Sequence, residues 1–511
     1  MYLCTGKREQ HKSFRKTHPT NRMSYETVIG LETHIQLSTF SKAFCSDAAA
    51  FGGAPNTHTS VISLAHPGTL PRLNKKAVEY AVKLGLALGC DINRHTTFDR
   101  KNYFYADLPK GFQTTQDRAP VCIGGSISLK IDKPVSGRHN PLIRIHHIHL
   151  EEDAGKSMHD QSPEHSYIDL NRAGVPLLEI VSEPDLRSPE EVAAYMEEMR
   201  RLVRWLGVSD GNMEEGSMRC DVNISIRPVG STTFGNRCEI KNVNSMRFAK
   251  RAIEYEVNRQ IALVEAGGKV EQETRGFDVA NGVTYSLREK ENAHDYRYFP
   301  EPDLPPVVLS EQYLADIHAE MPPLPAELEA LFMENFALPA YDAAQLTQDL
   351  DTARFAMQLL ESTRVRNASN SLNKQIANLL INKLLPWSVS TGAALDTCPV
   401  SKEHWIAYAE LVESGKLSAS AAAQRLFPAM LESPESAPEE LATRLNLLQS
   451  ADADFLEQLV DEVLARFPDK VAEYRKGKKG LIGMFMGEVM KNSKGKAEPQ
   501  ATTKLLQEKL N

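Results

Sequence analysis

The chain has 511 residues, too many for one hydrophobic core, so we expect two to four domains. Apolar residues make up 41% and charged residues 25%, a globular balance, and no apolar run approaches the roughly 20 residues that cross a bilayer, so no membrane span is expected. The net charge of -8 excludes nucleic-acid binding by the whole surface and leaves room only for a local basic patch.

Residues 1–23 are basic and acid-poor, yet they contain neither the apolar stretch of a secretory signal nor an amphipathic helix. We expect Met23 to be the natural start and the preceding residues to be a disordered extension. The cysteines are odd in number and lack short paired spacing, which argues against a disulfide framework and favours a cytoplasmic protein.

Three segments in the first part of the chain alternate apolar and polar residues, as strands with one polar face do. Such strands suit an antiparallel sheet whose polar side is a binding surface. The predicted faces hold Glu26, Val28, Gly30, Glu32, His34 and Gln36 in 26–36; Ile143, Ile145, His147, His149 and Glu151 in 142–152; and Arg219, Asp221, Asn223, Ser225 and Arg227 in 219–227.

Two helices are expected in the same part. Residues 188–191 (SPEE) form a capping box with proline at the first helical position, and apolar residues at helical spacing follow as far as Gly207. A second helix is predicted over about 246–266, before two glycines.

The proline-rich run 300–306 ends this part, so a catalytic domain is expected over 24–310. Alanine, leucine, glutamate and lysine at helical spacing then predict a helical domain over 311–435. The run 433–438 (SPESAP) resembles a linker, and 436–511 is expected to form a small helical tail domain.

Acidic residues gather on the predicted polar faces. Carboxylates that share a buried face repel one another, which calls for a cation, and oxygen ligands with one imidazole favour Mg²⁺ or Mn²⁺ over Zn²⁺. A solvated strand face is the simpler explanation of any single cluster, but Glu179 lies in an apolar run, where an unpaired carboxylate is costly. The clusters are Glu32/His34, Glu151-Glu152-Asp153, Glu179, and Glu214-Glu215 with Asp221 and Asn223.

A second set of residues is basic and suits the phosphates of a nucleotide beside the metal. Ordinary surface ion pairs account equally well for each basic cluster taken alone. The sequence contains no Walker A motif and no glycine-rich dinucleotide fingerprint. The set comprises Arg100, Lys101 and Lys110 in the aromatic segment 98–113, Lys241 in 239–244, Arg275, Arg288 and Arg297.

A cysteine–histidine metal site and a covalent nucleophile are not expected, because there is no CxxC pair and no GxSxG. In a regular strand His146 points away from His147 and His149, so the three histidines do not share a face. His149 is expected to be structural or to support Glu151 from outside the metal shell.

The C-terminal residues 467–511 hold ten lysines and arginines against five acids, inside an acidic chain. A solvated helix face is one interpretation and a patch that touches RNA phosphates is the other, which the contrast with the rest of the chain favours. The densest part contains Lys491, Lys494 and Lys496.

Taken together, these and neighbouring segments resemble the B subunits of heterotrimeric tRNA-dependent amidotransferases, from about residue 25 to the end. No single short motif carries the resemblance. The segments are 28–34 (VIGLETH), 66–71 (HPGTLP), 101–105 (KNYFY), 108–111 (LPKG), 148–156 (IHLEEDAGK), 169–172 (DLNR), 176–185 (PLLEIVSEPD), 218–223 (MRCDVN), 239–242 (EIKN) and 293–303 (AHDYRYFPEPD).

The resemblance implies an α+β fold: an antiparallel-sheet cradle, a helical domain, and a tail similar to YqeY-type proteins that binds tRNA. It implies a carbon–nitrogen ligase with glutamine as amido donor. ATP would phosphorylate the side-chain carboxylate of Glu-tRNA(Gln) or Asp-tRNA(Asn), and ammonia would displace the phosphate. The ammonia would come from a separate amidase (A) subunit, with a small C subunit completing the heterotrimer.

The resemblance also maps functional residues onto this chain. The metal ligands correspond to Glu32, His34, Glu151 and Glu179, and the catalytic residues to Glu151, Glu179, Glu214 and Lys241. Mg²⁺ would neutralise the phosphates of ATP. The expected nucleotide-binding residues are Arg100, Lys101, Lys110, Asn223, Arg275, Arg288 and Arg297, and the expected tRNA-binding residues are Lys491, Lys494 and Lys496.

One departure concerns zinc. Many family members carry a CxC and a CxxC pair, where this chain has Cys-Ser-Asp at 45–47 and Ser-Val-Ile-Ser at 60–63. Structural zinc is therefore not expected, and hydrogen bonds or packing must hold this loop.

Two other functions remain open. A glutamine-synthetase-like ligase acting on a free amino acid would use the same metals, but the basic tail argues against it. A non-enzymatic tRNA scaffold has no use for clustered carboxylates unless they bind a metal.

Overall fold

The computed structural model describes residues 24–131, 137–159, 161–241, 245–289, 296–366, 369–449, 453–493, 497 and 499–510. The extension expected over 1–23 lies outside them. The chain divides into two compact units, the first ending at Met321 and the second beginning at Pro322. Helix α4 (Glu311–Glu320) therefore belongs to the first unit, where it packs against α1 (Lys75–Ala87).

A ten-stranded mixed sheet forms the centre of the first unit, which confirms the α+β class. Its order is β15-β14-β13-β12-β1-β11-β8-β6-β2, with β7 paired to β8. β13 and β14 run parallel, and the other neighbouring pairs of the described sheet run antiparallel. The strands are β1 (Tyr25–Gln36), β2 (Asp91–Ile92), β6 (Cys122–Ile123), β7 (Ser126–Ser128), β8 (Leu142–Glu152), β11 (Pro176–Ser182), β12 (Met218–Pro228), β13 (Cys238–Ile240), β14 (Glu273–Asp278) and β15 (Val283–Glu289).

The alternation predicted for β1 is confirmed. Ile29 and Ile35 are fully buried, whereas Glu32 and His34 on the other face are half-buried. β1 lies between β11 and β12, so its polar face is flanked by strands on both sides. That position allows side chains from three strands to meet over one surface.

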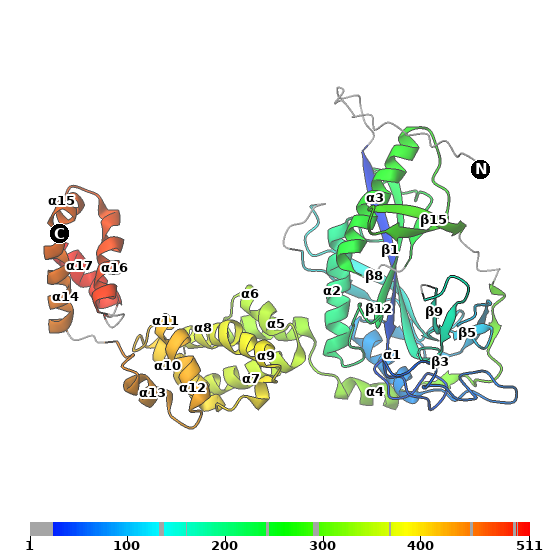
Figure 1. Ribbon diagram of the computed structural model, residues 1–511, viewed down its shortest axis with the longest axis horizontal. Coiled ribbons are helices and arrows are strands. Elements are labelled where there is room, and N and C mark those ends of the chain that lie inside the picture. The colour runs from blue at the N-terminus through cyan, green and yellow to red at the C-terminus, as the bar shows by residue number, and fades with distance from the viewer. Residues whose placement is uncertain are drawn as a thin grey trace. The chain divides into compact units, whose positions relative to one another are not determined.

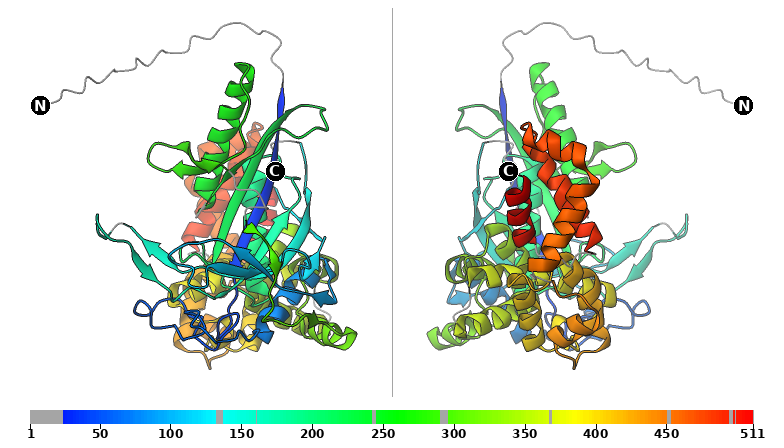
Figure 2. Two further views of the ribbon diagram at one scale, coloured as in Figure 1. Left: turned by 90° about the vertical axis from the view of Figure 1, so that its right-hand side faces the viewer. Right: turned by 90° about the vertical axis from the view of Figure 1, so that its left-hand side faces the viewer.

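Both helices predicted in this part are confirmed. α2 spans Pro189–Trp205, with the Ser188 hydroxyl accepting the backbone N–H of Glu191 at 3.2 Å, and α3 spans Met246–Glu265. α2 packs against α3, which packs against β12 and β15. The two helices lie on one side of the sheet (Figure 1), and from the other side β1 runs up its middle in blue (Figure 2, left).

Strand β8 departs from the predicted alternation. Consecutive residues Val181 and Ser182 of β11 pair with His147 and Ile145, so His146 is an extra residue in a β-bulge. The buried apolar positions consequently change from odd numbers before the bulge to even numbers after it, because one inserted residue reverses the faces. The prediction that Ile143 and Ile145 share a face with His147, His149 and Glu151 was therefore wrong.

Short strands and a long loop complete the first unit. The loop after β1 is held by a clasp in which the Ser63 hydroxyl donates to Asp47 Oδ2 at 2.5 Å and accepts the Ser60 N–H at 2.9 Å. Hydrogen bonds therefore connect the two ends of this loop. The strands are β3 (His95–Thr96), β4 (Asp99–Asn102), β5 (Phe112–Thr115), β9 (Lys156–Met158), β10 (Tyr167–Asp169), β16 (Phe299–Pro300) and β17 (Val307–Val308).

The second unit is helical, as predicted. One hydrophobic core lies between Phe332 and Leu447, around the fully buried Trp405, and another lies between Leu456 and Leu510, around Phe485. The second core belongs to the orange and red helices α14–α17 (Figure 2, right). The helices are α5 (Pro325–Phe336), α6 (Ala340–Leu346), α7 (Leu350–Val365), α8 (Asn370–Leu379), α9 (Leu385–Thr391), α10 (Lys402–Glu413), α11 (Ala419–Ala421), α12 (Phe427–Glu432), α13 (Pro438–Arg444), α14 (Ala453–Arg466), α15 (Pro468–Arg475), α16 (Ile482–Asn492) and α17 (Pro499–Leu510).

Two wide π-helical turns, Leu380–Leu384 and Ala422–Leu426, stand directly before helices whose second residue is proline. Proline lacks an N–H and crowds the preceding turn, and a wider turn accommodates it. In the described part of the chain, no helix is both long and apolar enough to cross a membrane.

Candidate metal and nucleotide site

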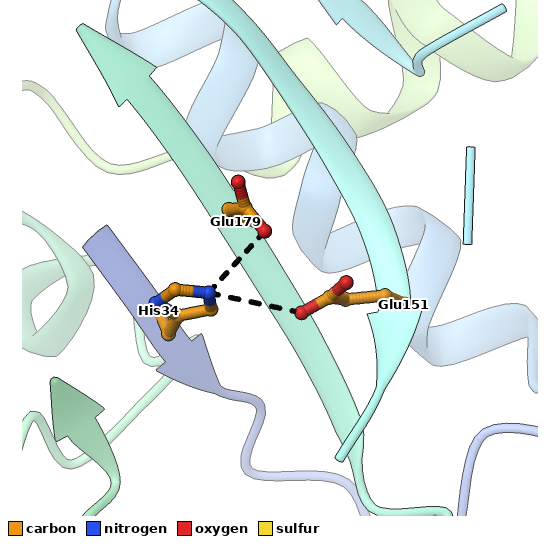
Figure 3. A group of neighbouring side chains, drawn as sticks. All are labelled: His34, Glu151 and Glu179. Atoms are coloured by element: carbon orange, nitrogen blue, oxygen red, sulfur yellow. Dashed lines mark ion pairs between the residues drawn. The ribbon is translucent and has the colours of Figure 1, made fainter. Parts of the chain in front are cut away.

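Three predicted metal ligands meet on the polar face of the sheet. His34 Nε2 lies 3.2 Å from Glu179 Oε2 and 3.9 Å from Glu151 Oε1 (Figure 3). They come from β1, β11 and β8. Strand pairing brings them together, because His34 pairs with Glu179, and Leu177, two residues before Glu179 in β11, pairs with Glu151. One donor atom from each lies within 4.8 Å of the others, the span of a metal-coordinating set.

The electrostatics of this group favour a bound cation. Burial alone lowers the pKa of His34, but the hydrogen bond and charge of Glu179, with the charge of Glu151, raise that pKa to about 9. Although burial raises the pKa of Glu179, His149 and His34 hold it well below its usual value. Two carboxylates supply hard oxygen donors, which suit Mg²⁺ or Mn²⁺, and the imidazole adds one borderline nitrogen donor.

Glu32, the fourth predicted ligand, belongs to a second group with Asp221 and Glu239. Lys241 Nζ lies 2.9 Å from Asp221 Oδ2 and 3.0 Å from Glu239 Oε1, and these carboxylates raise the pKa of Lys241 against the effect of burial. The ammonium thus already balances part of the negative charge in this group. The His34–Glu151–Glu179 group is therefore the better candidate for a divalent ion.

A cavity of about 210 Å³ opens over the first group. Lys101 lines it, and Glu151 and Glu179 raise the pKa of Lys101 although burial lowers it, so the cavity contains an ammonium facing carboxylates. Arg219 also lines it and donates to Asp153 Oδ2 at 2.9 Å. Arg219 was predicted on the polar face of its strand but not as a site residue.

A second cavity of about 160 Å³ adjoins Glu32 and Asn223, whose side-chain amide donates to Glu32 at 2.9 Å. It combines an apolar wall with Phe234 and the guanidinium of Arg237. Sequence reasoning missed these residues, although Val28 and Gly30 stand on the same predicted face as Glu32. Small or apolar residues beside a carboxylate on one strand face were the sequence signal that could have indicated this cavity. The remaining lining residues are Val28, Gly30, Leu31, Val181, Ser182, Pro184, Ser225 and Gly235.

Arg100 and Lys110 line a third cavity of about 250 Å³, and both already have partners there. Arg100 donates twice to Glu301 at 2.8 Å, and Lys110 pairs with Glu152 and donates to Thr114. Their predicted role toward a nucleotide stays a prediction.

Among the described residues, Arg275, Arg297 and Glu214 line neither of the two cavities beside the carboxylate groups. The Arg275 side chain is buried against Glu256 and the backbone carbonyl of Thr284, in a network that joins β14, β15 and α3. Arg297 is exposed, and Glu214 is exposed in a turn after α2. The side chain of Arg288 lies outside the described residues, as do Lys494 and Lys496, whereas the Lys491 side chain is exposed on α16.

The histidines of β8 correct another prediction. Because of the bulge, the ring of His146 does not point away: its Nδ1 lies 2.7 Å from His147 Nδ1, and His147 Nε2 lies 3.1 Å from His149 Nδ1. His149 Nε2 lies 3.6 Å from both Glu151 Oε2 and Glu179 Oε2. The three imidazoles therefore form a chain that ends near the carboxylates of Glu151 and Glu179.

Two family models together match most of the chain. Residues 27–315 match the model of the GatB/GatE catalytic domain, and residues 359–510 match the model of the GatB domain. A protein of Halorhodospira halophila is 47% identical over 96% of this chain and 99% of its own length, and one of Herminiimonas arsenicoxydans is 47% identical over 96% and 100%. One of Persephonella marina is 44% identical over 96% and 100%. All three are named as the B subunit of an aspartyl/glutamyl-tRNA(Asn/Gln) amidotransferase.

Proposed function

The chain belongs to the family of B subunits of aspartyl/glutamyl-tRNA(Asn/Gln) amidotransferases, and we propose that the polar face of its sheet is where ATP activates the substrate carboxylate. The enzyme class is a glutamine-hydrolysing carbon–nitrogen ligase. The side chain of glutamate or aspartate esterified to tRNA attacks the γ-phosphate, ADP leaves, and ammonia then displaces phosphate to give the amide.

One observation carries the proposal: the crowding of Glu151 and Glu179 around His34 on a partly buried surface. Separately, each would be an ordinary polar residue of a sheet. Together they hold negative charge that a divalent cation compensates, and Mg²⁺ bound there would neutralise the phosphates of ATP.

The cations beside this group suit charge that develops on a transferring phosphoryl group. Lys101 lines the cavity over His34, and Lys241 lies beside the second carboxylate group. Fixed ammonium groups in a partly dry cavity stabilise such charge more effectively than water does. We assign Lys101 and Lys241 to phosphate contact.

The cavity beside Glu32 and Asn223 is the best place for the nucleoside part of ATP. Its apolar wall suits an aromatic base, and Arg237 and Asn223 supply polar contacts. This cavity shares Glu32 with the second carboxylate group. A nucleotide bound in it would direct its phosphates toward the polar face of the sheet, which carries His34, Glu151 and Glu179.

The partners follow from the reaction. We propose that tRNA contacts the basic surface of helices α14–α17, which includes Lys491 and has its own hydrophobic core. The site described above offers carboxylates and cations rather than an activated nucleophile for glutamine hydrolysis. Ammonia would therefore come from an amidase (A) subunit, with a small C subunit completing the complex.

The test is an amidation assay with Glu-tRNA(Gln) and Asp-tRNA(Asn), using the chain alone and with its amidase and small-subunit partners. We expect amide formation that requires ATP, with glutamine as donor only when the partners are present. ATP hydrolysis that depends on a free amino acid and ignores tRNA would favour the glutamine-synthetase-like alternative.

A further inference from the structure

Strands β13 and β14 are the one parallel pair in the described part of the central sheet, and they meet beside the second carboxylate group. Their register places Thr274 of β14 opposite Glu239 of β13. Lys241 follows directly after β13, and its backbone N–H donates to the carbonyl oxygen of Arg275 at 3.1 Å. Strand β14 therefore holds the backbone of Lys241 and also brings Thr274 to a carboxylate that the Lys241 ammonium contacts.

The carboxylate of Glu239 has a donor at each of its two oxygens. Its Oε2 accepts a hydrogen bond from the Thr274 hydroxyl at 3.1 Å, and its Oε1 lies 3.0 Å from Lys241 Nζ. The terminal torsion of a glutamate side chain has only a broad preference of its own, so the partners decide how the carboxylate is turned. In this arrangement the Thr274 hydroxyl turns Oε1 of Glu239 toward the ammonium.

Burial distinguishes the residues that position from the residue that can contact a ligand. Thr274 is 2% exposed and Glu239 is 4% exposed, whereas the side chain of Lys241 is 31% exposed. Of the three, Lys241 presents the surface that can meet a phosphate. Its four-carbon stem is flexible, and Asp221 Oδ2, 2.9 Å from Nζ, restrains the ammonium from a second side. The place of the ammonium thus depends on two carboxylates, one of which is oriented by Thr274.

We propose that Thr274 is a positioning residue, which orients Glu239 so that the Lys241 ammonium is held where it meets the transferring phosphoryl group. The inference rests on the proposed function, because it takes Lys241 as a phosphate contact. An ammonium that is already in place stabilises the charge of the transition state without having to be reoriented, so loss of its positioning should lower kcat and leave the KM for tRNA unchanged.

The experiment measures amidation by the full chain in complex with its A and C partners, alongside the urea midpoint of each variant. ATP and Glu-tRNA(Gln) are saturating, and ammonium chloride is the donor, so that glutamine hydrolysis does not limit the rate. Thr274→Val keeps the branched shape of threonine but cannot donate, and we expect kcat to fall about tenfold. Thr274→Ser retains the hydroxyl and should stay within about threefold of wild type.

Thr284→Val is the matched control, because it removes a buried hydroxyl from the neighbouring strand β15. That hydroxyl donates to Glu256 at 2.8 Å and accepts from Arg275 Nε at 3.0 Å, so it belongs to the network that joins β14, β15 and α3. We expect Thr284→Val to lower the urea midpoint, as Thr274→Val does, but to keep kcat within about threefold of wild type.

A double-mutant cycle tests whether Thr274 acts through Lys241. Lys241→Met removes the ammonium and keeps much of the stem, and we expect kcat to fall about 100-fold. In the Lys241→Met background, Thr274→Val should lower kcat by less than about twofold, because the group that Thr274 positions is gone. A general loosening of the fold would instead lower kcat to the same extent in both backgrounds.

The outcomes keep the two proposals apart. If Lys241→Met turns over as fast as wild type, the assignment of Lys241 to phosphate contact is wrong. If Lys241→Met is slow but Thr274→Val matches wild type, only the role of Thr274 is overturned. A Thr274→Ser or Thr284→Val variant as slow as Thr274→Val, or equal effects of Thr274→Val in both backgrounds, would also overturn it.

Discussion

His34 of β1 faces Glu179 of β11 in direct register, and His34 Nε2 lies 3.2 Å from Glu179 Oε2. This pair joins the first strand of the sheet to a strand far along the chain, and β8 adds Glu151 from the other side. The site therefore exists only when the three strands pair in this register, since a shift of one residue would turn the carboxylates to the opposite face.

Removing either carboxylate should abolish the chemistry and spare tRNA binding. We expect Glu179→Ala and Glu151→Ala to lower the amidation rate at least about 100-fold, because several kcal/mol of metal-based charge stabilisation are lost. Glu164→Ala, which removes an exposed carboxylate of the same unit, is the control. Retained amidation in the site variants, measured with saturating tRNA, would exclude the metal role of these residues.

Filling the cavity beside Glu32 should weaken ATP binding selectively. A Cβ added at Gly30 meets its nearest neighbour, Pro184 Cα, at 3.7 Å, an ordinary contact, so Gly30→Ala should fold and behave nearly as wild type. Gly30→Leu would occupy part of the 160 Å³ cavity, and we expect the KM for ATP to rise about tenfold, equivalent to about 1.4 kcal/mol. An unchanged KM in Gly30→Leu would place the nucleoside elsewhere.

The clasp between Asp47 and Ser63 should control the reactivity of Cys45. Burial, with the negative charge of Asp47, raises the pKa of Cys45 to about 11, so the thiol is protonated and unreactive at neutral pH. Peptide-resolved alkylation at Cys45 should keep accelerating as pH rises from 8 to 10. Asp47→Ala should open the loop and speed alkylation at pH 8, and it should lower the free energy of unfolding by about 1 kcal/mol.

A plateau of the Cys45 rate below pH 9 would contradict the raised pKa, and an Asp47→Ala variant that reacts like wild type would contradict the clasp. Lys416→Ala, far along the chain and exposed, provides a control for the effect of substitution in general.

The basic tail should act on tRNA affinity more than on chemistry. The Lys491 side chain is 78% exposed on α16. Lys491→Ala should weaken tRNA binding and reduce the dependence of log Kd on log salt by about one unit, the effect of losing one phosphate contact. ATP turnover without tRNA should be unaffected. The same salt dependence in Lys491→Ala and wild type would remove this residue from the tRNA surface.

Local patterns were sufficient for much of the fold. The alternation over 26–36 predicted β1, and the capping box at 188–191 predicted the start of α2, because both depend on neighbouring residues. The bulge at His146 was not predictable in this way. The bulge is a property of the pairing between β8 and β11. No residue type in 142–152 indicates that His146 has no partner residue in β11.

In the candidate site too, local patterns predicted some residues, whereas strand pairing determined the rest of the arrangement. His34, Glu151 and Glu179 could be proposed because each sits on a polar strand face or in an apolar run that makes a carboxylate costly. The separation of Glu32 from them depends on register, which pairs it with Asp221 rather than with Glu179. From the sequence, Arg275 was expected to be available for a nucleotide. In the fold, its guanidinium forms an ion pair with Glu256 of helix α3.

The most direct test follows the substrate's oxygen atoms. If ATP phosphorylates the side-chain carboxylate, then Glu-tRNA(Gln) labelled with ¹⁸O in that carboxylate should transfer one labelled oxygen to inorganic phosphate for each amide formed. Mass spectrometry of the phosphate should show this transfer with wild-type chain and its partners, and none with Glu179→Ala. Amide formation by the wild-type enzyme with unlabelled phosphate would contradict activation of the carboxylate at this site.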